Sequence, residues 1–343
     1  MKKLYWIIPF SIVFFLTVFS FWAKSNKVLS PASEKLSLVS EITKIAEPQP
    51  KPISIMLGGD VMLGRWVEAS MRQKNDWQLA MAGLASKTTT ADFFMVNLEA
   101  PFLDNTATTP IDSLILHADP RGVESLRVAG VDVAILANNH IPDKGLLALQ
   151  KTTSVLSEGG IKYLGAGEDQ TAASSPLILE IGNNKIGILS YTYGTNIKSS
   201  GVYVNQVEVD NLARDIAAIK DKTDLIFVSM HAGTEYATYP SSSQINFAHK
   251  AIELGASIVF GHHPHVVQKM EKFQNGYIFY SLGNLVFDQA ANGPKTLGAI
   301  VNLKIENKQV KDFEILPVSI KNYYQTQFSD GQEKEFVLEA MTR

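Results

Sequence analysis

Five apolar segments, each with the length and composition of a buried strand, are followed directly by polar residues that can bind a ligand. The segments occupy residues 53–57, 93–96, 131–137, 224–230 and 257–260, and after them come Gly58-Gly59-Asp60, Asn97-Leu98-Glu99, Asn138-Asn139-His140, His231 and Gly261-His262-His263-Pro264-His265. Continuous apolar runs are typical of strands buried on both faces. In open α/β sheets, ligand sites form at the carboxyl ends of such strands. Packing alone does not explain the pattern, so the sequence predicts an α/β fold with a site at this edge.

Helical segments and hairpins separate these strands. Helices are predicted over residues 121–129, 209–220, 242–254 and 331–341, and a further strand over 277–282. Hairpins are predicted over 177–192, with a turn at Asn183-Asn184, and over 297–320, with a turn at Asn307-Lys308. Parallel units combined with hairpins predict a mixed sheet, or two facing sheets, with helices outside. No linker-like break interrupts residues 53–343, which indicates a single domain.

The chain of 343 residues contains no cysteine, which limits the metal chemistry that it can support. Disulfides, iron–sulfur clusters, Cys-ligated zinc and cysteine nucleophiles are excluded, so any metal must use nitrogen and oxygen ligands. A hydrophobic content of 45% and a net charge of −3 exclude a disordered chain. With 31 basic against 34 acidic residues, no basic excess is available for nucleic acid. Residues 1–52 carry +4 and the remainder −7, so bound cations are the expected anion-binding element.

Residues 4–23 contain no charged side chain, and as a helix they would span about 30 Å, the thickness of a bilayer core. Because Lys2 and Lys3 precede them, the positive-inside rule predicts a cytoplasmic stub at 1–3, a transmembrane signal anchor at 4–23 and an extracytoplasmic body at the cell membrane. A cleaved signal peptide is one alternative, although Phe21-Trp22-Ala23 is a poor cleavage site. A buried core helix is another. Residues 24–52, which end in a proline-rich run, are predicted to be an extracytoplasmic linker.

No single motif among the strand ends is specific. Asp60 after Gly59 is more typical of a turn or a helix cap than of a metal ligand, and Asn97 and Glu99 alternate along a strand end, so both face the same side. The run from His262 to His265 is the strongest element, because protonated imidazoles would repel one another and a metal would keep them neutral. A set of carboxylates, amides and imidazoles suits Mn²⁺, Zn²⁺, Fe²⁺ or Mg²⁺ and does not choose among them. His117 and His249 lack such neighbours and are assigned structural roles.

Taken in order, these motifs resemble those of the CapA family of poly-γ-glutamate capsule biosynthesis proteins, a branch of the metallophosphatase-like superfamily. The resemblance covers about residues 53–290 and rests on residues 58–65, 97–99, 136–140 with Asp143 and Gly145, 231–236, 261–266 and 280–284. It implies a metallophosphatase-like four-layer α/β/β/α sandwich, which the transmembrane helix predicted over residues 4–23 would precede. The domain is expected over residues 53–320, with a C-terminal tail at 321–343.

The resemblance also implies roles for individual residues. His140 would be the general acid, and the metal ligands would be Asp60, Glu99, Asn139, His231, His263 and His265, with His262 as an alternative to His263. Met62 stands where the first metallophosphatase motif has a histidine, so one or two divalent ions are expected. Substrate contacts are expected from Arg65, Asn97, Asn138, Glu235, Tyr236, His262, Ser281 and Asn284. A surface salt bridge is the alternative for Arg65, and a packed loop is the alternative for Glu235 and Tyr236.

The predicted function is that of a membrane-anchored, metal-dependent protein of capsule biosynthesis. It would hydrolyse or transfer a phosphoester or amide bond of an anionic surface polymer such as poly-γ-glutamate, beside other membrane proteins of capsule synthesis. A non-catalytic component that binds or exports the polymer is the main alternative, and a general phosphoesterase is another. His140 favours an enzyme, because binding alone needs no proton donor. Met62 in place of histidine favours the binding component.

Overall fold

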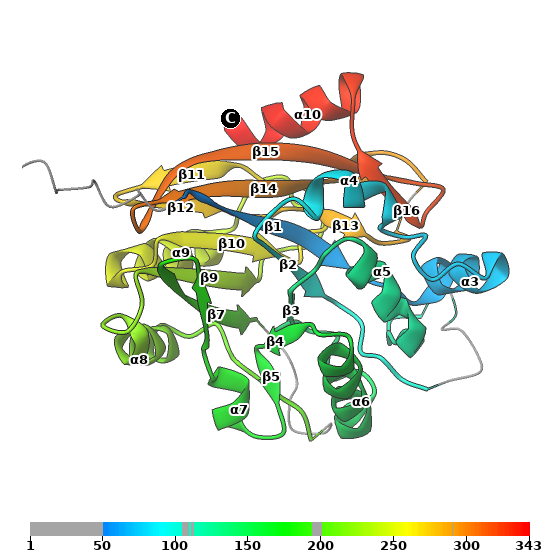
Figure 1. The fold of residues 1–343 in the computed structure, drawn as a ribbon, viewed down its shortest axis with the longest axis horizontal. Helices are drawn as coiled ribbons and strands as arrows, with labels where there is room; N and C mark the ends of the chain where they lie inside the picture. Colours follow the sequence, from blue (N-terminus) through cyan, green and yellow to red (C-terminus); the bar gives the residue numbers. More distant parts are fainter. Residues whose placement is uncertain (1–50, 105–109, 111–112, 194–200, 290) are drawn as a thin grey trace, which may run out of the picture. The chain divides into compact units, whose positions relative to one another are not determined.

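Two mixed β-sheets lie face to face in the computed structural model, which describes residues 51–104, 110, 113–193, 201–289 and 291–343 (Figure 1). The chain divides into two units, residues 1–49 and 50–343, and every described residue belongs to the second. The first sheet has the order β16 (Gln325–Phe328), β15 (Gln309–Lys321), β14 (Leu297–Glu306), β1 (Ile53–Val61), β2 (Phe93–Leu98), β3 (Val133–Ile135) and β4 (Lys162–Leu164), and β13 (Asn284–Val286) pairs with the end of β1. The second has the order β11 (Met270–Phe273), β12 (Gly276–Phe279), β10 (Ile258–His262), β9 (Leu225–His231), β7 (Asn184–Thr192) and β6 (Leu177–Ile181).

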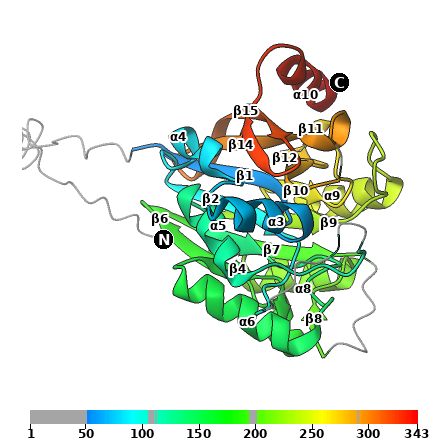
Figure 2. The same ribbon diagram turned by 90° about the vertical axis from the view of Figure 1, so that its right-hand side faces the viewer.

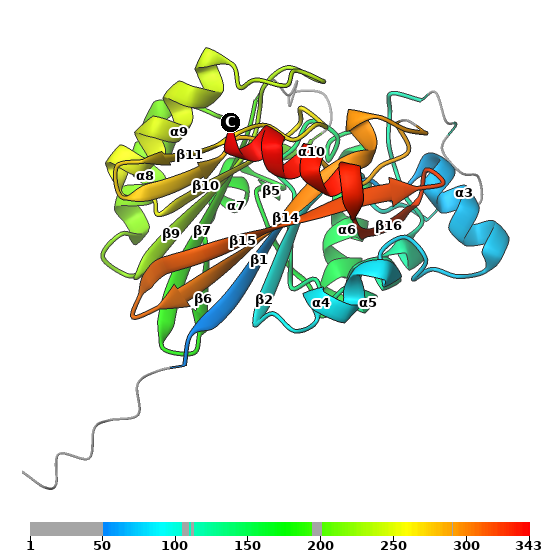
Figure 3. The ribbon, with the colours of Figure 1, turned by 90° about the horizontal axis from the view of Figure 1, so that it is seen from above.

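Helices cover the outer face of each sheet, as Figure 3 shows from above. The helices on the side of the first sheet are α3 (Arg65–Lys74), α4 (Ala85–Thr88), α5 (Val123–Val128) and α6 (Gly145–Glu158). Those on the side of the second sheet are α8 (Val209–Ile219) and α9 (Ser242–Leu254). Shorter elements complete the described chain: the antiparallel pair β5 (Ala166–Gly167) and β8 (Tyr203–Val204), α7 (Gln170–Ser174), and the 3₁₀ turns η1 (Ala82–Leu84), η2 (Pro120–Gly122) and η4 (Pro294–Thr296).

Three hydrophobic clusters alternate with the two sheets. Between the sheets, Ile55 and Leu57 of β1 belong to the same cluster as Phe227 and Phe260 of the facing sheet. Met56, between them in sequence, belongs to a second cluster, with α5 and α6. This alternation is the period of two that a strand buried on both faces requires. A third cluster joins β9 and β10 to α8 and α9. The layers therefore follow the order helix, sheet, sheet, helix, and the predicted α/β class is confirmed.

Most predicted elements form close to their expected bounds, and the differences occur at strand ends. The helix predicted over 242–254 is α9, which begins with a capping box between Ser241 and Gln244. The predicted turn at Asn183-Asn184 is wrong by one residue, because Ile181 pairs with Asn184 and the turn is Gly182-Asn183. Gly182 has a φ of 59°, a conformation that costs glycine little. The strand predicted over 131–137 is shorter, Val133–Ile135, and the loop after it carries Asn138, Asn139 and His140.

The C-terminal residues pack onto the first sheet. β16 pairs antiparallel with β15, and α10 (Gly331–Thr342) lies across β15 and β14 (Figures 1 and 3). Val337 and Met341 of α10 are buried in the cluster between the sheets. The helix predicted over 331–341 is therefore present, and it covers apolar surface of the sheet.

The predicted cytoplasmic stub and membrane anchor lie outside the described residues, as does the predicted linker except Lys51 and Pro52. Within the described part of the chain, no helix has both the length and the apolar character needed to cross a bilayer. The anchor therefore stays a prediction.

Candidate metal centre

The carboxyl ends of β1 and β2 place Asp60, Asn97 and Glu99 side by side (Figure 2 shows these two strands together). β1 and β2 are parallel, with Asp60 opposite Asn97 after an irregularity in register that follows Leu57. Gly59 permits this geometry, because a Cβ there would lie 2.1 Å from the carbonyl oxygen of Gly283. That same carbonyl accepts the backbone N–H of Asp60 at 3.0 Å. The close approach of two chain segments therefore fixes the position of the first carboxylate.

Asn97 connects the two carboxylates. Its side-chain amide donates to Asp60 Oδ1 at 2.8 Å and lies 3.4 Å from Glu99 Oε2 and 3.3 Å from His231 Nδ1. Asp60, Asn97 and Glu99 are all fully buried. The alternation of Asn97 and Glu99 along one strand thus brings both to the same face, as the sequence predicts.

The loop after β3 is organised by Asn138. Its amide donates to Asn97 Oδ1 at 3.1 Å and to the carbonyl of Leu98 at 2.8 Å. Its Oδ1 accepts from the backbone N–H groups of His140 and Ile141 at 3.2 and 3.0 Å. Asn138 therefore acts inside the protein, where it anchors the loop to β2.

The same loop carries Asn139 and His140 into the site. Asn139 Oδ1 lies 2.8 Å from His231 Nε2. His140 Nδ1 lies 2.8 Å from Asp143 Oδ2, which also accepts the backbone N–H of Leu116 at 2.6 Å. The carboxylate of Asp143 thus fixes the ring of His140, and it leaves Nε2 as the ring nitrogen that can exchange a proton.

The histidine run after β10 surrounds Asp60. His262 Nδ1 and His265 Nδ1 lie 3.0 and 3.2 Å from the two carboxylate oxygens of Asp60, and the backbone N–H of His263 donates to Asp60 Oδ2 at 3.2 Å. His263 and His265 have positive φ angles of 93° and 57°. Non-glycine residues in this region are strained, and such strain gathers at functional sites, where the surroundings enforce it.

Two groups of side chains have donor atoms close enough to share one ion. Asp60, Glu99 and His231 form one group, and Glu99, His263 and His265 form the other, with the ligand atoms of each group within 4.8 Å of one another. Glu99 belongs to both. A site of this composition, without sulfur, suits a hard or borderline divalent ion.

Several buried polar atoms of this cluster have no hydrogen-bond partner among the described residues. They are Glu99 Oε1, His263 Nδ1 and both ring nitrogens of His262, whose short approach to Asp60 is not aligned as a hydrogen bond. Buried polar atoms without partners cost free energy, and most native groups avoid that state. Glu99 and His263 belong to a group whose ligand atoms lie within 4.8 Å of one another, so the residues present fit the divalent metal that the sequence predicts.

The two carboxylates have opposite electrostatic environments. Burial alone would raise the pKa of Asp60, but the imidazoles of His262 and His265 outweigh it and hold that pKa well below its usual range. Burial, followed by repulsion from Asp60, raises the pKa of Glu99 well above its usual range. A divalent ion between the carboxylates would remove this repulsion.

The histidines beside these carboxylates are biased toward the neutral form. Burial, and then the charge of His263, lowers the pKa of His231 well below its ordinary value. Burial, and then the charge of His265, lowers the pKa of His263. Neutral imidazole is the form that ligates metals, so both rings are ready to bind near neutral pH.

Met62 does not take part in this cluster. It is fully buried in the cluster that packs under the helices, and its Sδ accepts the backbone N–H of Gly64 at 3.1 Å. Met62, which stands where the first metallophosphatase motif has a histidine, therefore supplies no metal ligand.

A cleft of about 410 Å³ opens beside the cluster. It is lined by Arg65, Ser113, Leu114, Leu116, His140, Glu235, Tyr236, His265, Phe287, Asp288, Gln289 and Tyr323. Arg65 forms a largely buried ion pair with Asp288 in the cleft wall, with Nε 2.9 Å from Oδ1, and its contact with a substrate stays a prediction. Glu235 and Tyr236 are exposed in the wall, and Tyr236 has a φ of 64°.

The remaining predicted contact residues lie beneath the cleft wall. Asn97, Asn138, His262, Ser281 and Asn284 are fully buried, and none lines the cleft. Ser281 Oγ accepts from the backbone of Gly283 at 3.2 Å, and Asn284 Oδ1 lies 3.0 Å from His265 Nδ1. Asn97, Asn138, Ser281 and Asn284 therefore contact and orient residues of the site from below.

Sequence reasoning missed Asp288 and Lys295. Asp288 follows β13, whose end pairs with β1, so the strand-end rule that selected Asp60 could have found it. Lys295 carries no sequence signal, because it reaches the site only through the fold, with Nζ 4.5 Å from the ring centre of Tyr236.

Comparison with known protein families identifies the chain. Residues 54–289 match the family model described as "Bacterial capsule synthesis protein PGA_cap". The chain belongs to this family. The match spans every strand end of the site described above, and it confirms the resemblance to CapA proteins.

Two relatives of the PGA_cap chain are CapA proteins of Bacillus. The capsule biosynthesis protein CapA of Bacillus anthracis is 28% identical over 317 residues, which cover 88% of this chain and 76% of that protein. The PGA biosynthesis protein CapA of Bacillus subtilis (strain 168) is 27% identical over 290 residues, which cover 82% and 75%.

Two solved structures share the fold of this PGA_cap protein. A hypothetical protein from Thermus thermophilus has a TM-score of 0.51 at 17% identity and covers 78% of this chain and 100% of its own. A "Putative 5'-Nucleotidase from Staphylococcus aureus in complex with alpha-ketoglutarate" has a TM-score of 0.52 at 15% identity, with 84% and 58% covered. At these identities the likeness describes the fold alone.

Proposed function

We propose that this PGA_cap protein is a metal-dependent enzyme of capsule biosynthesis with a metallophosphatase-like site. It would hydrolyse or transfer a phosphoester or amide bond of an anionic surface polymer, poly-γ-glutamate being the first candidate. The observation that carries the proposal is the buried set of unpartnered carboxylate and imidazole atoms beside an open cleft that contains His140. The capsule role follows the relatives, which are named for capsule and PGA biosynthesis.

The ligands of a first ion would be Asp60, Glu99 and His231, and those of a second would be Glu99, His263 and His265. A divalent ion at such a site supplies an activated water and stabilises the negative charge that develops in a displacement. Asn97 holds the two carboxylates in register, and Asn138 holds Asn97.

His140 is the residue that we assign to proton transfer. It lies in the cleft wall with its Nδ1 held by Asp143, so Nε2 can give a proton to the leaving group. Binding of a polymer needs no such oriented imidazole. The oriented imidazole of His140 therefore favours the enzyme over the binding component.

The test is to load the full chain with Mn²⁺, Zn²⁺, Fe²⁺ or Mg²⁺ and to measure release from phosphoester and γ-glutamyl substrates. His140→Ala is expected to reduce turnover by about 10²–10⁴-fold with its metal content unchanged. His249→Ala, outside the site, is the matched control and should retain both. A fully loaded wild type that turns over no substrate would reject the enzyme.

A non-catalytic component of the capsule synthesis complex is the second candidate. Met62, which supplies no ligand at the first-motif position, favours it. Polymer binding that depends on metal and is indifferent to His140→Ala would support this interpretation.

We also propose the cell membrane as the location, with the body outside the cytoplasm, on the basis of the uncharged segment at residues 4–23 and the lysines before it. Protease digestion of intact cells from which the wall has been removed tests this location. Loss of the body under these conditions supports it, and complete protection would reject it.

A further inference from the structure

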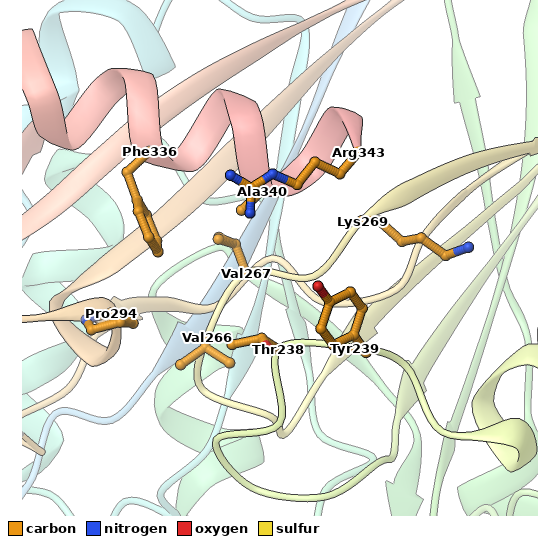
Figure 4. A pocket seen from close by; sticks show the side chains of 9 residues that line it. All are labelled: Thr238, Tyr239, Val266, Val267, Lys269, Pro294, Phe336, Ala340 and Arg343. Atoms are coloured by element: carbon orange, nitrogen blue, oxygen red, sulfur yellow. The ribbon is translucent and has the colours of Figure 1, made fainter.

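A second cavity of about 390 Å³ lies beneath the C-terminal helix (Figure 4). Its walls come from four parts of the chain: Thr238 and Tyr239, then Val266, Val267 and Lys269, then Pro294, and from α10 the side chains of Phe336, Ala340 and Arg343. In Figure 4, Phe336 extends from the helix above Pro294 and Val266, and the hydroxyl of Tyr239 is directed toward the helix. None of these residues belongs to the metal cluster or its cleft.

Two loop segments, residues 236–239 and 264–266, contribute side chains to both this cavity and the cleft, and we call them the ridge. Tyr236 and His265 line the cleft, whereas Tyr239 and Val266, close to them in sequence, line the second cavity. The backbone N–H of Tyr236 donates to the carbonyl of Pro264 at 2.8 Å and joins the two segments. The two hollows are therefore neighbours built from the same loops.

Lys295 extends this ridge toward the cleft. Its ammonium lies 4.5 Å from the ring centre of Tyr236, and Pro294, the preceding residue, lines the second cavity. An ammonium over the ridge is available to a ligand that crosses from one hollow to the other.

Two cationic residues lie at the edge of the second cavity, in a chain whose body is negative. Lys269 and Arg343 line it and no acidic residue does, whereas the cleft contains Glu235 and Asp288. Among the described residues, neither Lys269 nor Lys295 has a carboxylate within ion-pair distance. The Lys269 ammonium lies 5.9 Å from the ring centre of Tyr280, at the rim of the cavity, where it can reach a ligand that leaves the cavity. Arg343 pairs with Glu339, but both side chains are largely exposed, and such a pair is easily exchanged. With a net charge of −7 over residues 53–343, this local charge favours an anionic ligand.

We infer that the second cavity holds a further stretch of the same carboxylate-bearing polymer whose reacting bond lies in the cleft. This inference rests on the proposed function and adds the path that the polymer follows. The cleft has the volume of a small-molecule site, so a long chain must continue outside it. The apolar side chains of Val266, Val267 and Phe336 contact the backbone of the polymer, and the cations on the path bind its carboxylates.

The experiment compares two lengths of labelled γ-linked glutamate oligomer, about three and about twelve units, the second long enough to reach beyond the cleft. Dissociation constants are measured by fluorescence anisotropy on the full chain loaded with Mn²⁺. Wild type is compared with Lys269→Gln/Tyr239→Ala and with Lys269→Glu alone. Lys272→Gln is the matched control, because Lys272 lies on β11 with its ammonium over Tyr277 and outside the cavity.

Wild type is expected to bind the long oligomer about tenfold more tightly than the short one. The double variant should lose this difference while its affinity for the short oligomer and its metal content stay unchanged, and Lys272→Gln should retain it. Lys269→Glu keeps the aromatic wall and should weaken long-oligomer binding alone, which separates the charge from any folding defect.

Equal affinity of wild type for both lengths would overturn the inference and leave the proposed function standing. So would an unaltered length difference in both Lys269 variants. Failure of wild type to bind or turn over either oligomer would reject poly-γ-glutamate as the polymer of the proposed function, and with it this inference.

Discussion

His231 and His249 lie in two polar clusters that differ in hydrogen bonding. The polar atoms around His249 have partners, whereas several around His231 have none among the described residues. His249 Nε2 lies 3.0 Å from Glu271 Oε1, and Glu271 Oε2 accepts the hydroxyl of Tyr280 at 2.8 Å. The ring of His249 also stacks on Phe273, with ring centres 3.8 Å apart. Around His231, by contrast, Glu99 Oε1 and other atoms of the metal cluster have no partner among the described residues.

The difference separates structural from functional polar residues. A cluster whose atoms satisfy one another stabilises the fold and has no reason to bind an ion. A cluster with facing, unsatisfied carboxylate and imidazole atoms costs stability until a ligand arrives. The difference places His231, which ends a strand, in the candidate metal centre, and His249, inside α9, in a cluster whose atoms satisfy one another.

The largest expected effect comes from Glu99→Gln. Loss of the carboxylate shared by both ligand groups should weaken metal binding by more than about 100-fold. Isothermal titration with Mn²⁺ and Zn²⁺ measures this change. If the variant binds metal as tightly as the wild type does, the cluster around His231 is not the metal site.

A smaller effect, on stability and not on metal binding, is expected from Glu271→Ala. Removing this acceptor leaves the Tyr280 hydroxyl and His249 without their partner, at a cost of about 1–2 kcal/mol in the free energy of unfolding. Urea denaturation measures the loss, and metal affinity should be unchanged. A fall in metal affinity without a change in stability would contradict a structural role for this cluster.

Without metal, the free energy of unfolding should depend on pH differently in the wild type and in Glu99→Gln. The pKa of Glu99 is raised by burial and by repulsion from Asp60, so the folded protein holds its proton above the ordinary value of 4.5. As pH rises through the folded pKa, ionisation destabilises the wild type by about 1.4 kcal/mol for each unit of pKa shift. Glu99→Gln has no such group.

The stability of Glu99→Gln relative to wild type should therefore be greater at high pH than at low pH when both are stripped with a chelator. Urea denaturation at several pH values checks the sign. A relative stability that is constant, or that falls with rising pH, would show that Glu99 is not the repelled carboxylate described above.

The smallest expected effect is that of Asp143→Asn. The amide can still accept from the backbone of Leu116, but it orients His140 less strongly, so turnover should fall by about tenfold, less than in His140→Ala. Activity assays with metal content as the control measure this. An effect equal to that of His140→Ala would assign proton transfer to the pair as a unit.

Much of the site could be predicted because strand ends are a local property of the sequence. An apolar run followed by Asp60, Asn97 and Glu99, or by the histidine run after Gly261, places these residues on one edge as soon as the strands are parallel. The side on which Glu99 and Asn97 meet follows from the period of two along a strand.

Other features depend on contacts between segments far apart in the sequence. The pairing of Arg65 with Asp288, the burial of Met62 away from the ligands and the position of Lys295 over Tyr236 each depend on such contacts. No local pattern encodes these partners, and the sequence left the alternatives for Arg65 open for that reason.

By itself, then, the sequence determined the α/β class, the chemistry of the candidate ligands and the edge on which they gather, because strand periodicity and residue type are read along the chain. Among the described residues, the tertiary structure decided which atoms remain without partners, which residues face the cleft and which lie under it, and that a second cavity with cationic residues at its edge is built from the same loops. These properties depend on burial and on distances across the sheets. A polar atom without a partner costs free energy only when the fold removes it from water, and only then does it indicate a ligand site.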